Sequence, residues 1–272
     1  APLSATGTLS VSDVDLTDSV TPSVTSVSSD GDTGTLDNDD LLGMLGVDAA
    51  AIIEGTDTDG NLTWTFDSST VGEDFDYLAA DETLTLTYAV TVTDTAGATD
   101  TQNVVITITG NDDAPVISTD AGAVEEDTTQ EVSGTLTATD ADNADLAFVA
   151  ATDGSDYGTF TVDDAGNWTY ELANEAEATQ ALAEGQTVTE QYTVALSDGS
   201  TTTVDITITG DNDGPLIRVD ADDSAAASLA EANAPLSATG TLSVSDVDLT
   251  DSVTPSVTSV SSDGDTGTLD ND

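Results

Sequence analysis

Two stretches of the chain, ITITGNDDAP at 106–115 and ITITGDNDGP at 206–215, share one pattern. In each, apolar and polar residues alternate as in a half-buried strand, then give way to a glycine, three acidic or amide residues, one small residue and a proline. The glycine and the proline indicate that the chain turns or stiffens where the strand ends. We therefore expect both stretches to be domain boundaries, and their oxygen-rich side chains to hold a positive group.

The charge of the chain is strongly one-sided. Its 272 residues include 54 Asp and Glu but one basic residue, Arg218, which gives a net charge of -53. Nucleic acid is excluded as a natural partner because phosphate binding requires Lys and Arg, and docking on anionic lipid is disfavoured for the same reason. Carboxylates at this density repel one another, so we expect the compensating charge to come from outside the chain.

Other residue types narrow the class of protein further. Histidine is absent, which excludes nucleophile–histidine catalysis, and we do not expect an enzyme. Cysteine is absent as well, so disulfides contribute no stability. No apolar run approaches the ~20 residues of a membrane span, which predicts no direct membrane insertion. Without an initiator Met or a signal peptide, the sequence reads as a segment of a longer chain.

An exact internal repeat sets the domain organisation. Residues 1–39 and 234–272 are identical, which predicts a tandem array with a period of 233 residues. A weaker repeat, Gly-Thr-Leu followed by Asp-x-Asp, begins at Gly7, Gly134 and Gly240. We expect module one at 1–113, lacking its first strand and carrying an insertion near 41–55. Module two then covers 114–213, and the first part of a third module covers 214–272.

The apolar pattern predicts an all-β fold. In module two the candidate strands are 133–139, 145–150, 158–163, 166–172, 187–197 and 201–209. Roughly seven short strands in about 100 residues fit an Ig-like Greek-key β-sandwich, with Asp198-Gly199 as a hairpin turn. Trp64, Phe66, Trp168 and Tyr170 are expected in the core rather than on a ligand platform. The insertion at 41–55 is expected to form a short helix or turn that covers a core edge rather than binding a partner.

Four acidic or amide elements recur at matching places in the modules. They are the boundary itself, an acid in the first strand, an Asp-x-Asp pair, and an Asp that ends the penultimate strand. The residues are Asn111, Asp112, Asp113, Asp211, Asn212 and Asp213; Glu125 or Glu126, and Glu231; Asp13, Asp15, Asp140, Asp142, Asp246 and Asp248; and Asp94 and Asp198.

This oxygen-only set predicts calcium sites. Residues i and i+2 of an extended segment point the same way, so Asp140 and Asp142 should present two carboxylates side by side. In an Ig-like sandwich, the ends of the second and sixth strands can meet at one pole, which would bring this pair and Asp198 near Asn111–Asp113. Ca²⁺ takes six to eight oxygen ligands in a tolerant geometry, whereas zinc or copper would require His or Cys. The alternative is that each Asp only forms a turn or a solvated loop.

The order of motifs resembles a known family. FDYLAADETLTLTYAVTVTD (75–94), ITITGNDDAP, VEEDTTQEVSGTLTATDAD (124–142) and GNWTYEL (166–172) together resemble the VCBS-type, cadherin-like repeats of giant RTX-type bacterial adhesins exported by type I secretion. The resemblance implies an elongated array of cadherin-like sandwiches. It also implies that Asp211-Asn212-Asp213 acts as an interdomain calcium linker and Asp140-x-Asp142 as the matching pair. Cadherins place an acidic pair after the leucine at Leu182, where this chain has Ala183-Glu184-Gly185, so fewer than three ions per joint are expected.

These observations predict a structural function. The modules would be extender repeats of a cell-surface adhesin, made rigid by Ca²⁺ at their joints and supporting adhesion and biofilm formation. Their partners would be neighbouring repeats of the same chain, and the location extracellular. One alternative is a ligand-binding module for a glycan or a protein, with 41–55 and 153–157 as candidate surfaces. Another is a fibre built from identical chains.

Overall fold

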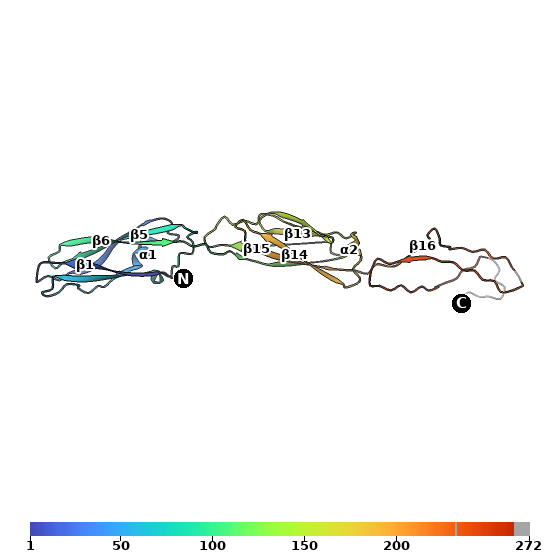
Figure 1. The fold of residues 1–272 in the computed structure, drawn as a ribbon, viewed down its shortest axis with the longest axis horizontal. Helices are drawn as coiled ribbons and strands as arrows, with labels where there is room; N and C mark the ends of the chain where they lie inside the picture. The colour runs from blue at the N-terminus through green and yellow to red at the C-terminus, as the bar shows by residue number, and fades with distance from the viewer. Residues whose placement is uncertain (232, 264–272) are drawn as a thin grey trace. The chain divides into compact units, whose positions relative to one another are not determined.

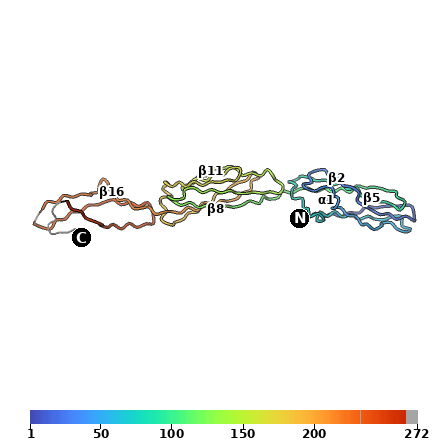
Figure 2. Tube along the Cα trace, turned by 180° about the vertical axis from the view of Figure 1, so that it is seen from behind, coloured from blue at the N-terminus to red at the C-terminus, as the bar shows by residue number. Residues whose placement is uncertain are grey.

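The computed structural model describes residues 1–231 and 233–263. The last part of the expected third module, 264–272, lies outside the described residues. Chain contacts divide the protein into two units, 1–116 with 139–146, and 117–138 with the chain from 147 onward. Figure 1 shows the ribbon of the chain and Figure 2 its Cα trace.

Unit 1 is built from two antiparallel sheets. The first has the order β1-β4-β3 and the second β2-β5-β6. Their bounds are β1 (Ser4–Ser12), β2 (Thr21–Asp30), β3 (Leu45–Val47), β4 (Asp59–Asp67), β5 (Thr83–Thr93) and β6 (Thr99–Thr109), with a 3₁₀ turn at Ser68–Thr70. Alternate residues of β5 are buried, which follows from the two-residue period of a strand with one face on a core.

The core of unit 1 holds the aromatic and aliphatic side chains of both sheets. Leu62 and Phe66 of β4 and Leu84, Leu86 and Tyr88 of β5 are almost fully buried. Phe66 and Tyr88 meet edge to face, with ring centroids 6.4 Å apart. Trp64 is partly buried and packs against the same cluster.

The insertion of unit 1 forms a helix that starts before the expected stretch. Helix α1 spans Asn38–Gly43, because Asp37 caps its first turn and Asp40 completes a capping box. Leu41 is buried and its carbonyl accepts a hydrogen bond from the Tyr88 hydroxyl at 2.8 Å. Met44 and Ile53 are each 1% exposed. The prediction that the insertion covers the core is confirmed.

Unit 2 also contains two main sheets. One has the order β11-β12-β13-β9 and the other β14-β15-β8, where β8 runs parallel to β15. The bounds are β8 (Asp120–Glu125), β9 (Glu131–Thr135), β11 (Ala151–Gly154), β12 (Gly158–Val162), β13 (Asn167–Leu172), β14 (Thr187–Ala195) and β15 (Thr201–Thr209), with the short helix α2 at Glu177–Gln180. Two further small sheets pair β7 (Val116–Ile117) with β10 (Ala138–Thr139), and β16 (Leu216–Arg218) with β17 (Ser243–Ser245).

An aromatic stack fills the core of unit 2. Phe160 stacks on Tyr192 at 4.6 Å between ring centroids and on Trp168 at 5.9 Å. The Trp168 indole N–H donates to Asp120 Oδ2 at 2.9 Å, which satisfies its polar atom. The expected core roles of Trp168 and Tyr170 are confirmed, since both are at most 1% exposed.

One predicted strand is wrong. Residues 145–150 form turns and irregular chain, and the strand lies later, at β11. The acidic turn after β10 continues through Asp145, and only Phe148 bridges the neighbouring sheet, at Leu196. The hairpin at Asp198-Gly199 is confirmed, because Leu196 N–H donates to Ser200 O and Gly199 adopts a φ of 93°.

Candidate metal centres

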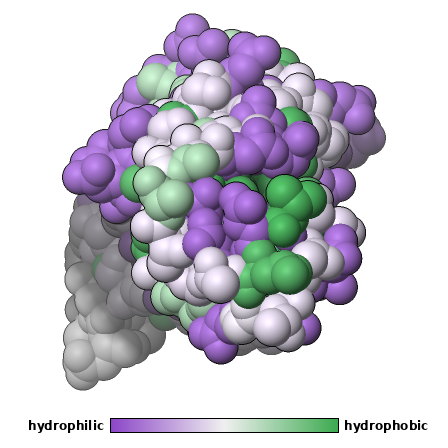
Figure 3. Space-filling model, turned by 90° about the vertical axis from the view of Figure 1, so that its left-hand side faces the viewer, coloured by the Kyte–Doolittle hydropathy of each residue, from purple (hydrophilic) through white to green (hydrophobic). Residues whose placement is uncertain are grey.

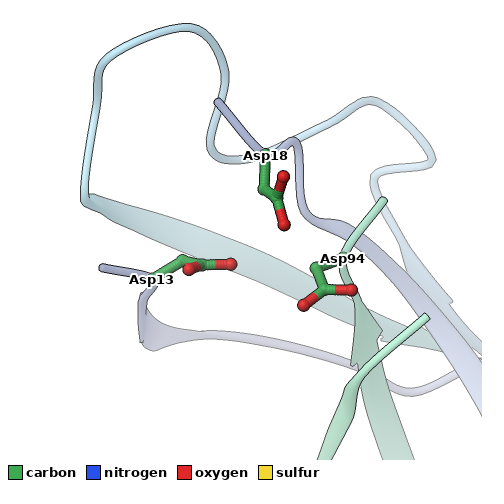
Figure 4. Close-up of side chains that lie close together, drawn as sticks. All are labelled: Asp13, Asp18 and Asp94. Carbon is green, nitrogen blue, oxygen red and sulfur yellow. The ribbon is translucent and has the colours of Figure 1, made fainter. Parts of the chain in front are cut away.

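Three carboxylates of unit 1 converge, as Figure 4 shows. Asp13, Asp18 and Asp94 each offer an oxygen within 4.8 Å of the other two. Backbone N–H groups fix two of them, since Asp13 Oδ1 accepts from Asp15 N at 2.9 Å and Asp94 Oδ1 from Ala98 N at 2.8 Å. All three are partly buried, so the group combines negative charge with limited access to water.

This group differs from the prediction in one member. Asp15, expected to act with Asp13, is exposed, and Asp18 takes its place beside Asp94. The local turn explains the exchange, because Asp18 N–H donates to Asp15 O at 3.1 Å and brings the third Asp back toward the first. The sequence signal for Asp18 was the spacing Asp-x-Asp-x-x-Asp, which starts at Asp13 and recurs from Asp140 and from Asp246.

A second group in unit 1 joins the first boundary stretch to the next Asp-x-Asp pair. Asp113 N–H donates to Asp142 Oδ2 at 3.0 Å, and Asp142 N–H donates to Asp140 Oδ1 at 3.3 Å. The pair follows β10 in a turn and is not extended as expected; the turn itself brings the two carboxyls together. Nearby, Asn111 Nδ2 donates to Asp112 O at 3.1 Å.

The pKa values of the two carboxyls of this pair are shifted in opposite directions. The interaction between the two carboxyl side chains raises the pKa of Asp140, burial and the charge of Asp112 add to that rise, and donation from Asp142 N–H opposes it. Donation from Asp113 N–H lowers the pKa of Asp142. Asp142 Oδ1 is buried and has no hydrogen-bond partner among the described residues. One carboxylate oxygen at this boundary is therefore fixed in place and unpaired.

A third group lies in unit 2 at the second boundary. Glu126 is 1% exposed, and its Oε2 accepts from Asp211 N at 3.2 Å while Gln180 Nε2 donates to its Oε1. Asp213 N–H donates to Asp248 Oδ2 at 2.8 Å. Asp248 is only 2% exposed, and its N–H donates to Asp246 Oδ1 at 3.2 Å.

Burial is the main cause of the pKa shifts in this third group, and repulsion between carboxylates adds to it. Burial raises the pKa of Glu126 and also that of Asp213, and in both cases neighbouring carboxylates, including Asp127 and Asp248, raise it further. Asp213 Oδ2 and Asp248 Oδ1 are buried without a hydrogen-bond partner in the part of the chain that the structure describes. A buried anion without a partner is costly, so this group favours binding a cation.

The remaining predicted residues have other surroundings. Glu125 is exposed and accepts from Thr128 Oγ1 at 2.9 Å, so of the alternatives Glu125 and Glu126 only the second faces the boundary. Asp198 accepts from both the N–H and the hydroxyl of Ser200 at 2.9 Å in the hairpin. Asn212 Nδ2 donates to Asp213 O, and Glu231 is exposed. Asp127, which the sequence did not single out, contributes charge to the third group.

The donor set fits a hard divalent cation. Among residues 1–231 and 233–263, three buried carboxylate oxygens at the two boundaries lack hydrogen-bond partners, one each on Asp142, Asp213 and Asp248. Carboxylate, amide and backbone oxygens are the ligands of Ca²⁺, and Mg²⁺ demands a stricter geometry than loop segments supply. The residues present therefore fit calcium.

The outer surface of unit 1 mixes both kinds of side chain. Figure 3, which looks at the left-hand side of Figure 1, shows green hydrophobic residues beside purple hydrophilic ones. Val14 and Leu16, in the loop between Asp13 and Asp18, are 86% and 55% exposed. Among the described residues, no helix is long and apolar enough to cross a membrane.

Comparisons with known proteins place the fold. Residues 112–210 match the family model described as a bacterial cadherin-like domain. Among solved structures, protocadherin gamma B7 extracellular cadherin domains 1–4 is 17% identical, with a TM-score of 0.37, over 83% of this chain and 51% of that chain. Human CDH23 EC21–23 is 12% identical, with a TM-score of 0.40, over 86% of this chain and 74% of that chain. No curated protein matches.

The fold is an all-β, cadherin-like Greek-key sandwich. The chain spans about half the length of the protocadherin gamma B7 structure, 51%, and of a structure of PcdhgB3 EC1-4, 54%. Cadherin-like domains are typically extracellular adhesion modules without catalytic activity, and cadherin domains generally bind Ca²⁺. Residues 112–210 of this chain are therefore similar to a bacterial cadherin-like domain.

Proposed function

We propose that the chain consists of extender repeats of a large bacterial surface adhesin of the RTX type, exported by type I secretion and serving attachment and biofilm formation. Its modules are residues 1–113, 114–213 and the segment from 214 onward. Ca²⁺ binds at the module boundaries and makes them rigid. The observation that carries the proposal is the set of buried, unpaired carboxylate oxygens on Asp142, Asp213 and Asp248.

Each boundary has its own ligands in this proposal. At the first, Asp112, Asp113, Asp140 and Asp142 hold the ion, with Asn111 supplying a carbonyl. At the second, Glu126, Asp211, Asp213, Asp246 and Asp248 do so. Asp13, Asp18 and Asp94 supply part of a further site. Calcium supplies the positive charge that these carboxylates lack, since the chain has one basic side chain.

The physical consequence is mechanical. Without calcium, neighbouring carboxylates repel and favour conformations in which the boundary loops open. With calcium, one ion is bound simultaneously by the linker and by the Asp-x-Asp turn that follows it, and bending would break its coordination. Sites with Kd ~10⁻⁴–10⁻³ M suffice outside a cell, and binding to the folded state alone also adds stability by linkage.

A calcium titration of the full chain tests this proposal. We expect calorimetric uptake of Ca²⁺, a larger maximum dimension by small-angle scattering and a higher thermal midpoint than in chelator. Asp142→Asn should reduce the uptake, whereas Asp153→Asn, an exposed acid on β11, should not. Unchanged dimension and midpoint on adding calcium would refute the calcium-stiffened array, and equal uptake by both variants would remove Asp142 from the site.

A further inference from the structure

Glu126 differs from the other carboxylates of the third group in its hydrogen bonds. Its side chain is 1% exposed, and both carboxylate oxygens accept, Oε2 from Asp211 N–H at 3.2 Å and Oε1 from the Gln180 side-chain amide. Asp213 and Asp248, in contrast, each have one buried oxygen without a partner in the described part of the chain. Glu126 is therefore held from two sides, by the boundary stretch and by a side chain of module two.

The amide of Gln180 has a defined orientation. Its Nε2 donates to Glu126 Oε1 and also to the carbonyl oxygen of Asn174 at 3.1 Å. Because an amide nitrogen carries two hydrogens, each of these acceptors receives one. If the amide were turned over, its own oxygen would face two acceptors. The network of hydrogen bonds therefore assigns the nitrogen to the side that faces Glu126.

Asn174 connects this amide to the residue that follows Glu126 in the chain. The Asn174 side chain is 9% exposed; its Oδ1 accepts from Asp127 N–H at 2.9 Å and its Nδ2 donates to Asp127 Oδ1 at 2.7 Å. Asp127 has a φ of 57°, in the left-handed region that residues other than glycine rarely adopt. Two hydrogen bonds thus hold this backbone in place. We call Glu126, Asp127, Asn174 and Gln180 the Glu126 network.

The helix that carries Gln180 is fixed as well. Gln180 is the last residue of α2. The preceding residue, Thr179, is 0% exposed, and its hydroxyl donates to the carbonyl oxygen of Ala173 at 3.0 Å. The start of the Gln180 side chain is therefore set by the packing of module two, and its end is set by two hydrogen bonds.

A neutral donor suits a carboxylate that is to bind a cation. An ionised carboxylate has about four lone-pair sites, and Gln180 and Asp211 occupy two of them, which leaves the others for an ion. A lysine or an arginine at position 180 would also satisfy Glu126, but its charge would repel the cation. The amide orients the carboxylate and leaves its negative charge in place.

This amide is not part of the pattern that the two modules share. Both modules contain the sequence Trp-Thr-aromatic, which ends at Phe66 in module one and at Tyr170 in module two. Ten residues further on, module one has Asp76 and module two has Gln180. An ionised aspartate has no hydrogen to donate to a carboxylate. The Glu126 network therefore belongs to module two and concerns the second boundary alone.

We propose that Gln180, supported by Asn174, is a positioning residue that holds Glu126 in the orientation in which it binds the cation of the second boundary. Carboxylate ligands of metal ions are themselves held by outer hydrogen bonds, and losing such a partner lowers metal affinity by roughly 10–100-fold. The inference rests on the proposed calcium function of this boundary. It adds to that function two residues that do not themselves contact the ion.

A calcium titration followed by nuclear magnetic resonance reads the two boundaries separately in the full chain. The backbone amide signal of Asp211 reports on the second boundary and that of Asp113 on the first. Gln180→Met keeps the length of the side chain without its donors, so half-saturation at Asp211 should move roughly tenfold to higher calcium, while Asp113 should not move. Gln130→Met changes an exposed glutamine of the same module and should move neither signal.

The possible outcomes separate this inference from the function on which it rests. If Gln180→Met lowers the thermal midpoint in chelator but leaves half-saturation at Asp211 unchanged, the role of Gln180 is only structural and the inference is wrong. If neither signal of the unsubstituted chain responds to calcium, the proposed function itself fails, and the inference with it.

A second variant keeps the test valid if Gln180→Met does not show the far-ultraviolet dichroism of the native chain. Gln180→Asn keeps the amide on a side chain that is one methylene shorter and does not span both acceptors. We expect it to move half-saturation at Asp211 in the same direction as Gln180→Met. Calcium binding at Asp211 as tight as in the unsubstituted chain would overturn the proposal.

Discussion

Replacing Asp248 by Asn should change the stability of the chain in opposite directions with and without calcium. Asp248 is 2% exposed, its Oδ2 accepts from Asp213 N–H, and its Oδ1 has no partner in the described chain. Asparagine keeps the shape and can keep the accepted hydrogen bond through its carbonyl. The substitution therefore removes mainly one negative charge, which stands near Asp213, Asp246 and Glu126.

The magnitude follows from the surroundings. Two like charges roughly 4 to 8 Å apart repel by ~2–4 kcal/mol at an effective dielectric of about 20. Asp213 is only partly buried, so solvent screening reduces this to about 1–2 kcal/mol. In chelator, Asp248→Asn should stabilise unit 2 by that amount. In millimolar calcium, loss of a ligand charge should weaken binding about tenfold, or by ~1.4 kcal/mol, and lower the stability.

The internal repeat supplies a matched control. Asp15 stands in the same local sequence, Ser-Asp-Val-Asp-Leu-Thr-Asp, but is exposed. Asp15→Asn therefore makes the same chemical change in the same turn without the buried surroundings. Urea unfolding of both variants, in chelator and in calcium, separates the effects. If Asp248→Asn destabilises the chain in chelator, or follows Asp15→Asn in both conditions, the inferred buried repulsion is wrong.

Three other predictions test the electrostatics and the packing. The pKa of Glu126 is raised in the folded state. Its contribution to stability is therefore present below its unfolded pKa and is lost as pH rises through the folded value. In chelator the thermal midpoint should rise as pH falls from about 7 toward about 4.5, and it should rise less for Glu126→Gln than for Glu125→Gln. Glu190 Oε2 accepts from Ser155, Tyr170 and Tyr192 hydroxyls at 2.7–3.0 Å, so Glu190→Gln should cost about 1–3 kcal/mol in urea unfolding, and a loss no larger than for exposed Glu171→Gln would contradict this. A Cβ on Gly7 would overlap the Trp64 ring, so Gly7→Ala should lower stability by about 1–3 kcal/mol. Gly43→Ala, whose Cβ meets nothing within 4 Å, should not lower it. Equal unfolding midpoints for the two variants would refute the contact.

Much of the fold was predictable because antiparallel strands joined by short turns leave a local pattern in the sequence. Alternating apolar residues located β12 to β15, and Asp198-Gly199 located the turn between β14 and β15. β8 carries the sequence Asp-Ala-Gly-Ala-Val-Glu, which has weak strand propensity, and it is held by parallel pairing to β15, some 84 residues away, from Asp120 to Val204. A non-local pairing of this kind leaves no pattern within the strand itself.

The sequence predicted where acidic residues gather, but not which of them lie together in one site. The repeated Asp-x-Asp located the acidic turns, yet side-chain direction depends on packing. Glu125 and Glu126 are adjacent and have the same side chain, so the sequence does not distinguish them. In the structure, Gln180 and Asp211 form hydrogen bonds with Glu126. Asp18 joins its group through a turn hydrogen bond to Asp15 O that the pair alone does not reveal.

The exact repeat separates what local sequence determines from what the rest of a module determines. Asp15 N–H donates to Asp13 Oδ1 at 2.9 Å, and Asp248 N–H donates to Asp246 Oδ1 at 3.2 Å, so both copies form the same turn. Their surroundings differ, because Asp15 is exposed and Asp248 is buried against the boundary stretch at Asp213.

The burial of the apolar residues also differs between the two copies. Val20 and Val27 are 3% and 7% exposed, whereas their copies Val253 and Val260 are 40% and 61% exposed. The same local sequence thus forms the same acidic turn in both copies, and contact with the boundary stretch at Asp213 buries the turn at Asp248.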